Sequence, residues 1–490
     1  MIINFEDKTN SVNVNYLQSL VLMYLPCEKF ALSDDDKSSL ALNADYDENK
    51  SEYTVKTVLS HNGKICEKTL CEIKDESNAN QGKNVVGKAF LECAKEIFGY
   101  VPQWGIMTGI RPAKVAVNYL LNHSESETRK YLEKEYLVSK NRAKVCVMTA
   151  VNEMKVVKNI KDNSASVYIS IPFCPSKCRY CSFVSSSTKK LLSLIPDYLE
   201  KLYSDIEKIS RFSKSSGIKI ETVYIGGGTP AILDENQISK LLHVVNDNLF
   251  SSDLREFTFE AGRPDCTTKE KLKIIKNAGV TRLSINTQTT NDDILCAVGR
   301  KHTFDDYKSC MNEAHDAGFD NINTDLIAGL PGESEKSFEK SVDDIFEVSP
   351  SNITVHTFAL KKSSVYKTQD AEKIDANSKT AAKMINYSSK TLISGGYEPY
   401  YMYKQKNTVG NLDNTGYSKK GFECLYNVYM MGEYHTVFSA GADGSTKYVS
   451  HDRNTIKRIF SPKYPYEYLD ESKYAGFDEK SAYEFYEKYY

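Results

Sequence analysis

The feature that most constrains the fold is a regular alternation of strand-like and helical sequence between residues 165 and 360. Six short β-rich runs occur there, each followed by helical sequence: SVYISIPF, ETVYIGGG, EFTFEAG, RLSINTQT, NINTDLIAG and NITVHTFAL. Strands that alternate with helices favour a parallel sheet with right-handed crossovers. Six units are too few for a closed (β/α)8 barrel, so the pattern predicts an α/β fold built on an open, partial (β/α)6 barrel.

The sequence on either side of this region has a different character. Before it, apolar and polar residues alternate on both sides of Asn62-Gly63, which predicts a β-hairpin because Asn-Gly accepts positive φ angles. Helical spacing begins at Gly82, and the segment WGIMTGIRPAK from Trp104 reads as a binding loop, a hinge or a packed turn. After it, the chain is rich in tyrosine. We therefore expect an α+β N-terminal domain (1–160), the partial barrel (161–370) and a C-terminal extension that covers the substrate (371–490).

The bulk composition excludes several classes of protein. The chain has 490 residues, a net charge of -2 and an acidic, polar N-terminus, which give no indication of a nucleic-acid partner, a membrane surface or a secretory signal. Its apolar runs are too short to span a bilayer. We expect a cytoplasmic monomer, in which the 12 cysteines are free of structural disulfides. Nine of them are scattered and read as small buried hydrophobic residues.

Unusual residues cluster at the ends of the predicted strands, where the chemistry of such folds gathers. They are Cys174, Cys178 and Cys181 after the first strand, Gly226 to Pro230 after the second, Glu260 and Gln288 at the ends of the third and fourth, Asp325 in the fifth, and His356 and Ala359 in the sixth. Structural roles remain open for some of them. Glu260 could cap the following helix, and Asp325 could pair with Arg282 or Arg300. His302 and His356 could be satisfied polar residues of the barrel wall.

The three clustered cysteines have the spacing C-x3-C-x2-C. A structural zinc site usually needs four ligands, and a redox dithiol needs only two cysteines. Three cysteines in one loop fit an iron–sulfur cluster that leaves one iron open for a small molecule. Phe173, Tyr180 and Phe183 flank the loop and would shield such a cluster from water.

A C-x3-C-x2-C loop after the first strand of a β/α barrel, joined to GGGTP after the second, resembles the radical S-adenosylmethionine (SAM) superfamily. The resemblance implies a 4Fe–4S cluster whose open iron chelates the methionine part of SAM. Reduction then yields a 5′-deoxyadenosyl radical that removes a hydrogen atom from the substrate.

The motifs YISIPFCPSKCRYCSF, YIGGGTP, RLSINTQT, VGRKHT, NTDLIAGLPGE and HTFAL resemble the oxygen-independent coproporphyrinogen III oxidase family. WGIMTGIRPAK, FEAGRPD and YKQKNTVGN are similar to the HemZ-type coproporphyrinogen dehydrogenases. The resemblance implies that Cys174, Cys178 and Cys181 ligate the cluster, and that SAM is bound by Tyr168, Tyr180, Gly227, Gly228, Thr229, Glu260, Gln288, Arg300, Asp325 and Ala359. It leaves the catalytic residue unassigned.

The sequence departs from each branch of the family. The oxidase branch has an extra cysteine after the third cluster ligand, where this chain has Ser182 and Phe183. The haem-chaperone branch has an HNxxYW motif, where this chain has LYNVYMM with Tyr426 in place of the histidine.

The resemblance to the oxidase family implies decarboxylation of coproporphyrinogen III to protoporphyrinogen IX, with a flavodoxin- or ferredoxin-like electron donor and an unidentified acceptor. Arg263 and YYMYKQKN from Tyr400 offer substrate contacts. The alternatives are a haem-binding, chaperone-like protein or a radical SAM enzyme that methylates haem or opens its ring.

Overall fold

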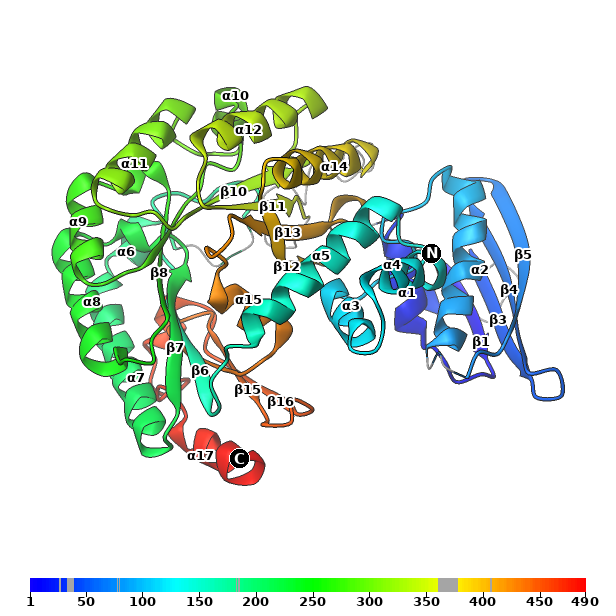
Figure 1. Cartoon of the computed structure of the whole chain (residues 1–490), viewed down its shortest axis with the longest axis horizontal. Helices are drawn as coiled ribbons and strands as arrows, with labels where there is room; N and C mark the ends of the chain where they lie inside the picture. The colour runs from blue at the N-terminus through cyan, green and yellow to red at the C-terminus, as the bar shows by residue number, and fades with distance from the viewer. Residues whose placement is uncertain are drawn as a thin grey trace.

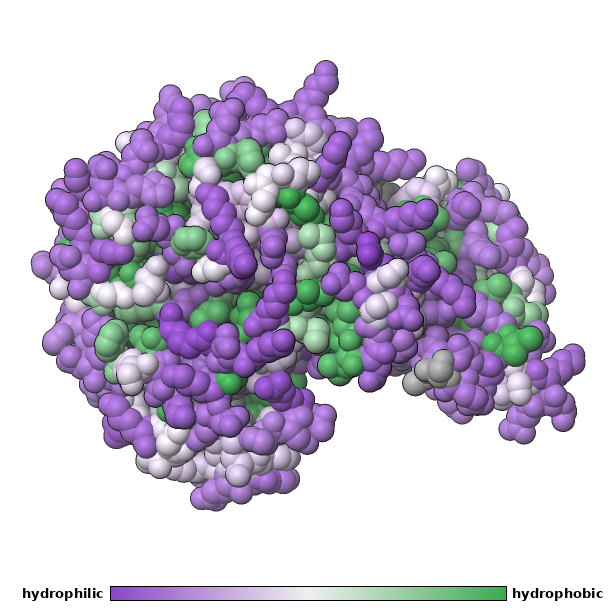
Figure 2. All heavy atoms as spheres, in the orientation of Figure 1, coloured by the Kyte–Doolittle hydropathy of each residue, from purple (hydrophilic) through white to green (hydrophobic). Residues whose placement is uncertain are grey.

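The structure, a computed structural model, describes residues 1–25, 28–32, 39–76, 78, 80–181, 183, 186–359, 378–405 and 408–490. Figure 1 shows a small N-terminal body, a large body built around a curved sheet, and a group of helices between them. The large body carries the residues predicted to bind the cofactors. On the face drawn in Figure 2 the surface is mostly hydrophilic.

Six parallel strands form the centre of the large sheet, and each corresponds to one of the strands predicted from the sequence. They are β6 (Ser164–Ile171), β7 (Lys219–Gly227), β8 (Glu256–Gly262), β9 (Arg282–Ile285), β10 (Ile322–Ala328) and β11 (Asn352–Thr357). Consecutive strands are neighbours in the sheet. The predicted parallel α/β sheet is therefore confirmed.

Helices follow the strands and cover the outer face of this sheet (Figure 1). On α8, the buried residues Ile238, Leu241, Leu242 and Val245 recur at helical spacing and join the main core. The Asp234 side chain accepts a hydrogen bond from the Gln237 amide and so fixes the start of this helix. The outer helices are α6 (Lys189–Leu192), α7 (Ile195–Ser215), α8 (Glu235–Leu249), α9 (Lys269–Asn277), α10 (Asp292–Ala297), α11 (Phe304–Asp316) and α12 (Glu335–Val348), with short 3-10 turns η1 (Pro230–Ile232) and η2 (Pro264–Cys266).

C-terminal residues extend the same sheet at both edges. At one edge β14 (Thr436–Ala440) pairs in parallel with β6, and β15 (Ser445–Val449) and β16 (Ile456–Phe460) follow antiparallel. At the other edge β13 (Asp413–Ser418) pairs antiparallel with β11, and β12 (Glu398–Lys404) lies outside it. Among the described residues the edge strands β12 and β16 do not pair with each other, so the barrel is open. The boundary predicted at residue 370 lies outside the described residues.

Five further C-terminal segments complete the large body: α14 (Ser378–Ser394), η4 (Val409–Asn411), α15 (Leu425–Gly432), α16 (Pro465–Tyr468) and α17 (Glu479–Tyr489). Helix α15 packs against β7 and β12. Its residues Tyr426, Asn427, Met430 and Met431 consequently reach the interior of the barrel.

The N-terminal body is a five-stranded sheet covered by two helices. Its strands have the order β2-β1-β3-β4-β5. Asn62 and Gly63, with φ angles of 48° and 76°, form the turn between β4 and β5 and confirm the predicted hairpin. The elements are β1 (Ile2–Asp7), α1 (Val14–Leu22), β2 (Ala31–Leu32), β3 (Leu40–Asp47), β4 (Glu52–His61), β5 (Lys64–Ile73) and α2 (Gln81–Phe98).

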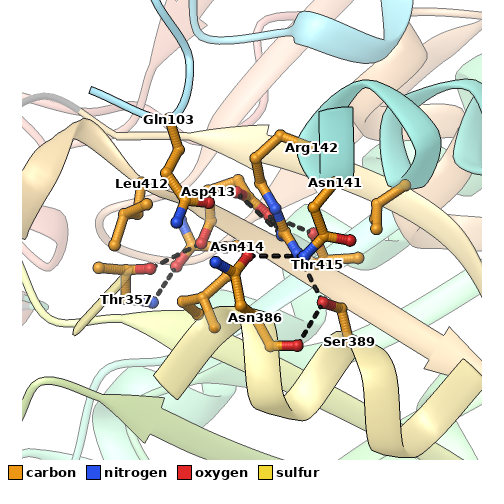
Figure 3. Close-up of polar contacts among 12 residues, drawn as sticks. Gln103, Asn141, Arg142, Thr357, Asn386, Ser389, Leu412, Asp413, Asn414 and Thr415 are labelled. Atoms are coloured by element: carbon orange, nitrogen blue, oxygen red, sulfur yellow. Dashed lines mark hydrogen bonds and ion pairs between the residues drawn. The ribbon is translucent and has the colours of Figure 1, made fainter. Parts of the chain in front are cut away.

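Helices α3 (Pro112–Leu120), α4 (Glu125–Glu135) and α5 (Lys140–Val157) lie between the two bodies (Figure 1). A buried polar network fixes them to the large sheet. The Asp413 carboxylate accepts hydrogen bonds from Trp104 Nε1 at 2.8 Å and from Arg142 at 3.2 Å. Arg142 also donates to the Ser389 hydroxyl at 2.6 Å (Figure 3). Trp104 is thus packed in the interior, in agreement with the packed-turn interpretation of its segment.

No helix within the described residues has the length and apolar character needed to cross a lipid bilayer.

Candidate active site

A cavity of about 500 Å³ occupies the inside of the barrel, at the carboxyl ends of the parallel strands. Every residue that the resemblance assigns to the cluster or to SAM lines this cavity. They are Tyr168, Cys174, Cys178, Tyr180, Cys181, Gly227, Gly228, Thr229, Glu260, Gln288, Arg300, Asp325 and Ala359. Residues that are separated by up to 191 positions in the chain therefore face one space, while their individual roles remain predictions.

The cysteine loop is fixed by backbone hydrogen bonds to neighbouring segments. The Cys174 amide donates to the Ser186 carbonyl at 3.2 Å, and the Arg179 amide donates to the Val298 carbonyl at 3.0 Å. Burial raises the pKa of Cys174 to about 12, and burial also raises the pKa of Cys181. Without a bound metal the Cys174 and Cys181 thiols are therefore neutral, and a metal centre would stabilise their thiolates. Ser182 lies outside the described residues, whereas the exposed Phe183 lines the cavity.

The donor set fits an iron–sulfur cluster better than a single metal ion. Among the described residues, no three His, Cys, Asp or Glu side chains are close enough to hold one ion together. Cys174, Cys178 and Cys181 nonetheless face the same cavity. A 4Fe–4S cluster binds each thiolate through a different iron, so its ligands need not converge on one point.

The glycine segment after β7 packs directly against the cysteine loop. The Gly228 amide donates to the Ile171 carbonyl and the Thr229 amide to the Phe173 carbonyl, both at 2.8 Å. The Thr229 hydroxyl lies 3.4 Å from Cys174 Sγ. A Cβ atom added to Gly228 would lie 2.5 Å from the Phe173 carbonyl oxygen and 3.0 Å from that sulfur. The close approach of the two loops therefore requires glycine at position 228.

Glu260 presents a buried carboxyl group to the cavity. Burial, reinforced by the negative charge of Asp325, raises its pKa to about 8. The Tyr224 hydroxyl lies 3.4 Å from one carboxyl oxygen. A cationic ligand group at this position would stabilise the ionised carboxylate, as the predicted contact with SAM requires.

Gln288 is held in a strained conformation by the neighbouring strand. Its φ angle is 77°, its amide donates to the Asp325 carbonyl, and its carbonyl accepts from the Ile327 amide, both at 2.9 Å. Its side-chain Oε1 is buried and has no hydrogen-bond partner within the described structure. A strained residue with an unsatisfied polar atom facing a cavity is typical of a ligand site.

Two details differ from the strand ends predicted from the sequence. Gln288 lies beyond the end of β9, and Ala359 lies beyond the end of β11. Each is instead held by an isolated bridge, Gln288 to Leu326 and Ala359 to Thr408. The left-handed backbone at Gln288 interrupts the strand while preserving the position of the side chain at the cavity wall.

The alternative structural pairings considered for the carboxylates are wrong. Asp325 accepts a hydrogen bond from Asn323 at 2.8 Å and lies 3.6 Å from His356 Nε2, rather than beside Arg282 or Arg300. Although burial opposes the effect, His356 and these hydrogen bonds hold the pKa of Asp325 below its ordinary value. The helix after Glu260 is capped by Thr268 instead.

Arg300 and Tyr180 position each other beside the cluster loop. Arg300 Nε donates to the Tyr180 hydroxyl at 3.1 Å, and its Nη1 donates to the Asn286 carbonyl at 2.6 Å. Neither contact neutralises the guanidinium charge, which therefore remains available for an anionic group such as the SAM carboxylate.

Three tyrosines form an aromatic wall that the sequence interpretation only partly identified. The rings of Tyr168, Tyr224 and Tyr426 lie 4.8 to 6.1 Å apart with interplanar angles of 20° to 30°. From the sequence, Tyr426 is identified only as a departure from the haem-chaperone motif, and Tyr224 is not among the predicted site residues. The inward position of Tyr224, two residues before Gly226, follows from strand alternation and could have been found.

Arg282 is a second cavity residue that is not among the predicted site residues. In RLSINTQ the polar residues Arg282, Ser284, Asn286 and Gln288 alternate with Leu283 and Ile285. All four polar residues line the cavity, and both apolar ones are buried in the core. This alternation is the expected pattern of a strand with one polar face.

Only some of the other candidate substrate contacts line the cavity. Arg263, Tyr401, Tyr403 and Gln405 line the cavity, whereas Tyr400 is buried in the surrounding core and Lys406 and Asn407 lie outside the described residues. His356 lines the cavity, and His302 is buried 4.0 Å from Asp265.

Comparisons with known proteins agree with this geometry. Residues 168–345 match the family model of the radical SAM superfamily. The chain is 32% identical, over 84% of its length and 83% of the relative, to the oxygen-independent coproporphyrinogen-III oxidase-like protein HemZ of Bacillus subtilis. It is 33% identical to the heme chaperone HemW of the same organism, over 57% of this chain and 70% of the relative.

A solved structure supports the fold. Coproporphyrinogen III oxidase (HemN) from Escherichia coli, a radical SAM enzyme, matches with a TM-score of 0.50 and 21% identity, over 66% of this chain and 71% of that one. The fold and the cysteine loop thus define a protein of the radical SAM class. Within that class, the chain belongs to the family of HemZ and HemW. Radical SAM proteins use a 4Fe–4S cluster and SAM, which are the cofactors of this chain.

Proposed function

We propose that this chain is an anaerobic radical SAM oxidoreductase that converts two propionate side chains of coproporphyrinogen III to vinyl groups, giving protoporphyrinogen IX. The observation that carries the proposal is the single cavity in which the cysteine thiols, the polar strand-end residues and the tyrosine wall face one another. Bound together, the cluster and SAM supply a radical that removes a hydrogen atom from the substrate.

The residues of the chain bind, orient and exclude water. Cys174, Cys178 and Cys181 ligate the cluster. Tyr168, Tyr224 and Tyr426 offer ring faces to the flat parts of a tetrapyrrole. The cavity residues proposed to hold SAM are Tyr168, Tyr180, Gly227, Gly228, Thr229, Glu260, Gln288, Arg300, Asp325 and Ala359.

The overall reaction balances for each propionate as follows. One hydrogen atom leaves the β-carbon, the bond to the carboxylate breaks, and carbon dioxide departs. The vinyl group forms when one electron passes to an external one-electron acceptor. A flavodoxin- or ferredoxin-like protein is the proposed electron donor.

A second candidate is haem binding, as in a chaperone. It is favoured by the similarity to HemW and by Met430 and Met431, whose thioethers can ligate haem iron and which line the cavity. Tyr426, however, stands where the chaperone motif has histidine. Burial holds the pKa of Tyr426 well above its ordinary value, so the phenol stays neutral and stacks on Tyr224. A neutral phenol is a weak iron ligand, which favours the enzyme.

The test is an anaerobic assay with reconstituted protein, dithionite, SAM and coproporphyrinogen III, with Cys178→Ala as the matched control. Mass spectrometry measures 5′-deoxyadenosine and tetrapyrrole products. Loss of two carboxyl groups, in proportion to the 5′-deoxyadenosine formed, supports the proposal. 5′-Deoxyadenosine without decarboxylation would redirect the radical chemistry to another tetrapyrrole, for example methylation or ring opening of haem. Tight haem binding with neither product would favour the chaperone.

A further inference from the structure

Arg282 is a cavity cation that neither the cluster nor the SAM assignment uses. Its side chain is 2% exposed and lines the cavity. Among the described residues its guanidinium makes one hydrogen bond, which Nη1 donates to the Asn321 side-chain oxygen at 2.9 Å. Within the described part of the chain it forms no ion pair. An arginine is always charged, so a buried guanidinium with unused donors needs an anionic partner.

A carboxylate near Arg282, that of Glu256, is engaged by the start of α15. Glu256 lies close enough to interact with Arg282 electrostatically. Its two oxygens, however, accept hydrogen bonds from the backbone amides of Leu425 at 2.8 Å and Tyr426 at 3.1 Å. The Cys424 thiol donates to the same carboxylate at 3.3 Å. Glu256 therefore fixes the start of α15, and among the described residues no hydrogen bond or ion pair joins it to Arg282.

The strand register places Arg282 in the same row as Tyr168 and one row below Glu260. Tyr168 is paired with Tyr224, Tyr224 with Thr258, and Thr258 with Arg282, so these four residues form one row across β6 to β9. Glu260, paired with Ser284, belongs to the next inward-facing row. Two residues along a strand correspond to about 6.6 Å. The same row thus contains a cation and two rings of the tyrosine wall.

We propose that Arg282 binds a carboxylate of the substrate, one row below Glu260 and in the row of Tyr168. The geometry suits a propionate, because the planar guanidinium can hold a carboxylate through two parallel hydrogen bonds. The rings of Tyr168, Tyr224 and Tyr426 would contact the apolar part of the same molecule. The choice of a tetrapyrrole propionate rests on the proposed function. The carboxylate site itself rests on Arg282.

The test measures binding of two porphyrins that differ only in their acid groups. Coproporphyrin III and its tetramethyl ester are titrated into reconstituted protein and followed by fluorescence quenching, in wild type, Arg282→Gln and Arg282→Lys. Arg211→Gln, on the exposed surface of α7, is the control arginine change. Arg282→Gln should weaken coproporphyrin III binding roughly 10- to 100-fold, since a charge-assisted hydrogen bond is lost. The affinity of Arg282→Lys for coproporphyrin III should lie between those of wild type and Arg282→Gln. The affinity for the tetramethyl ester should be the same in all three proteins.

Several outcomes overturn the inference. One is equal affinity for coproporphyrin III in wild type and Arg282→Gln. Another is a loss of SAM affinity with unchanged porphyrin binding, which would assign Arg282 to SAM. If Arg282→Gln does not fold, Arg282→Lys carries the test, and equal porphyrin affinity in that variant and wild type refutes the bidentate site. Wild type that binds the acid and the ester equally well, or neither of them, also refutes it.

The same variants separate this inference from the proposed function. Binding of coproporphyrin III through Arg282 without any decarboxylation would refute the proposed reaction and keep the carboxylate site. Decarboxylation by Arg282→Gln with the wild-type KM would keep the reaction and refute the site.

Discussion

Replacing Asp413 by asparagine tests the buried network in which Arg142, on α5, is joined to Asp413 of the large sheet (Figure 3). The Arg142 and Asp413 side chains are 0% and 1% exposed, and Asp413 also accepts from Trp104 and from the Thr415 hydroxyl. An amide keeps the shape but leaves the Arg142 charge buried without its partner. Breaking a buried ion pair in this way costs about 3 to 5 kcal/mol. We expect Asp413→Asn to reduce the free energy of unfolding by this amount.

The assay follows the fluorescence of Trp104 during denaturation in guanidinium chloride. Trp104 is the only tryptophan of the chain, so the signal reports the transition of the network itself. Arg142→Met should lower the free energy of unfolding by a similar amount. The double variant Asp413→Asn/Arg142→Met should recover at least about 1 kcal/mol of the summed losses, because no charge is stranded. Asp470→Asn, at an exposed ion pair, is the control and should leave the transition unchanged. A loss below about 1 kcal/mol in Asp413→Asn, or strictly additive losses, would refute the reasoning.

Three further predictions concern the cofactors. Cys178→Ala should abolish the cluster in anaerobically reconstituted protein, as measured by iron and sulfide analysis; full iron retention would contradict the cluster assignment. Gly228→Ala should lower cluster and SAM occupancy, because its Cβ would overlap the Phe173 carbonyl, whereas Gly109→Ala has open space and should not. SAM affinity, measured by equilibrium dialysis, should rise with pH. With a pKa of about 8, the ionised fraction of Glu260 increases roughly tenfold between pH 7 and pH 9, and only the carboxylate attracts a cation. The rise should be absent in Glu260→Gln, and an identical profile in that variant would remove Glu260 from the SAM site.

Local patterns in the sequence were sufficient to predict the central architecture and most of the candidate site. The six parallel strands follow from short apolar runs between helical stretches, and the N-terminal hairpin follows from Asn62-Gly63. The predicted cluster and SAM residues line one cavity because the carboxyl ends of parallel strands meet at one edge of a sheet. Residues that follow different strands can therefore be predicted to lie close together in space from the sequence alone.

The tertiary structure alone determined the contacts that join distant parts of the chain. Strands β12 to β16 extend the sheet at opposite edges, and Arg142 reaches Asp413 across 271 positions. Helix α15 brings Tyr426 against Tyr224, and the register places Arg282 beside the tyrosine wall. Alternation shows which face of a strand a residue occupies. The pairing and register of strands depend instead on packing between segments far apart in sequence, which no local pattern encodes.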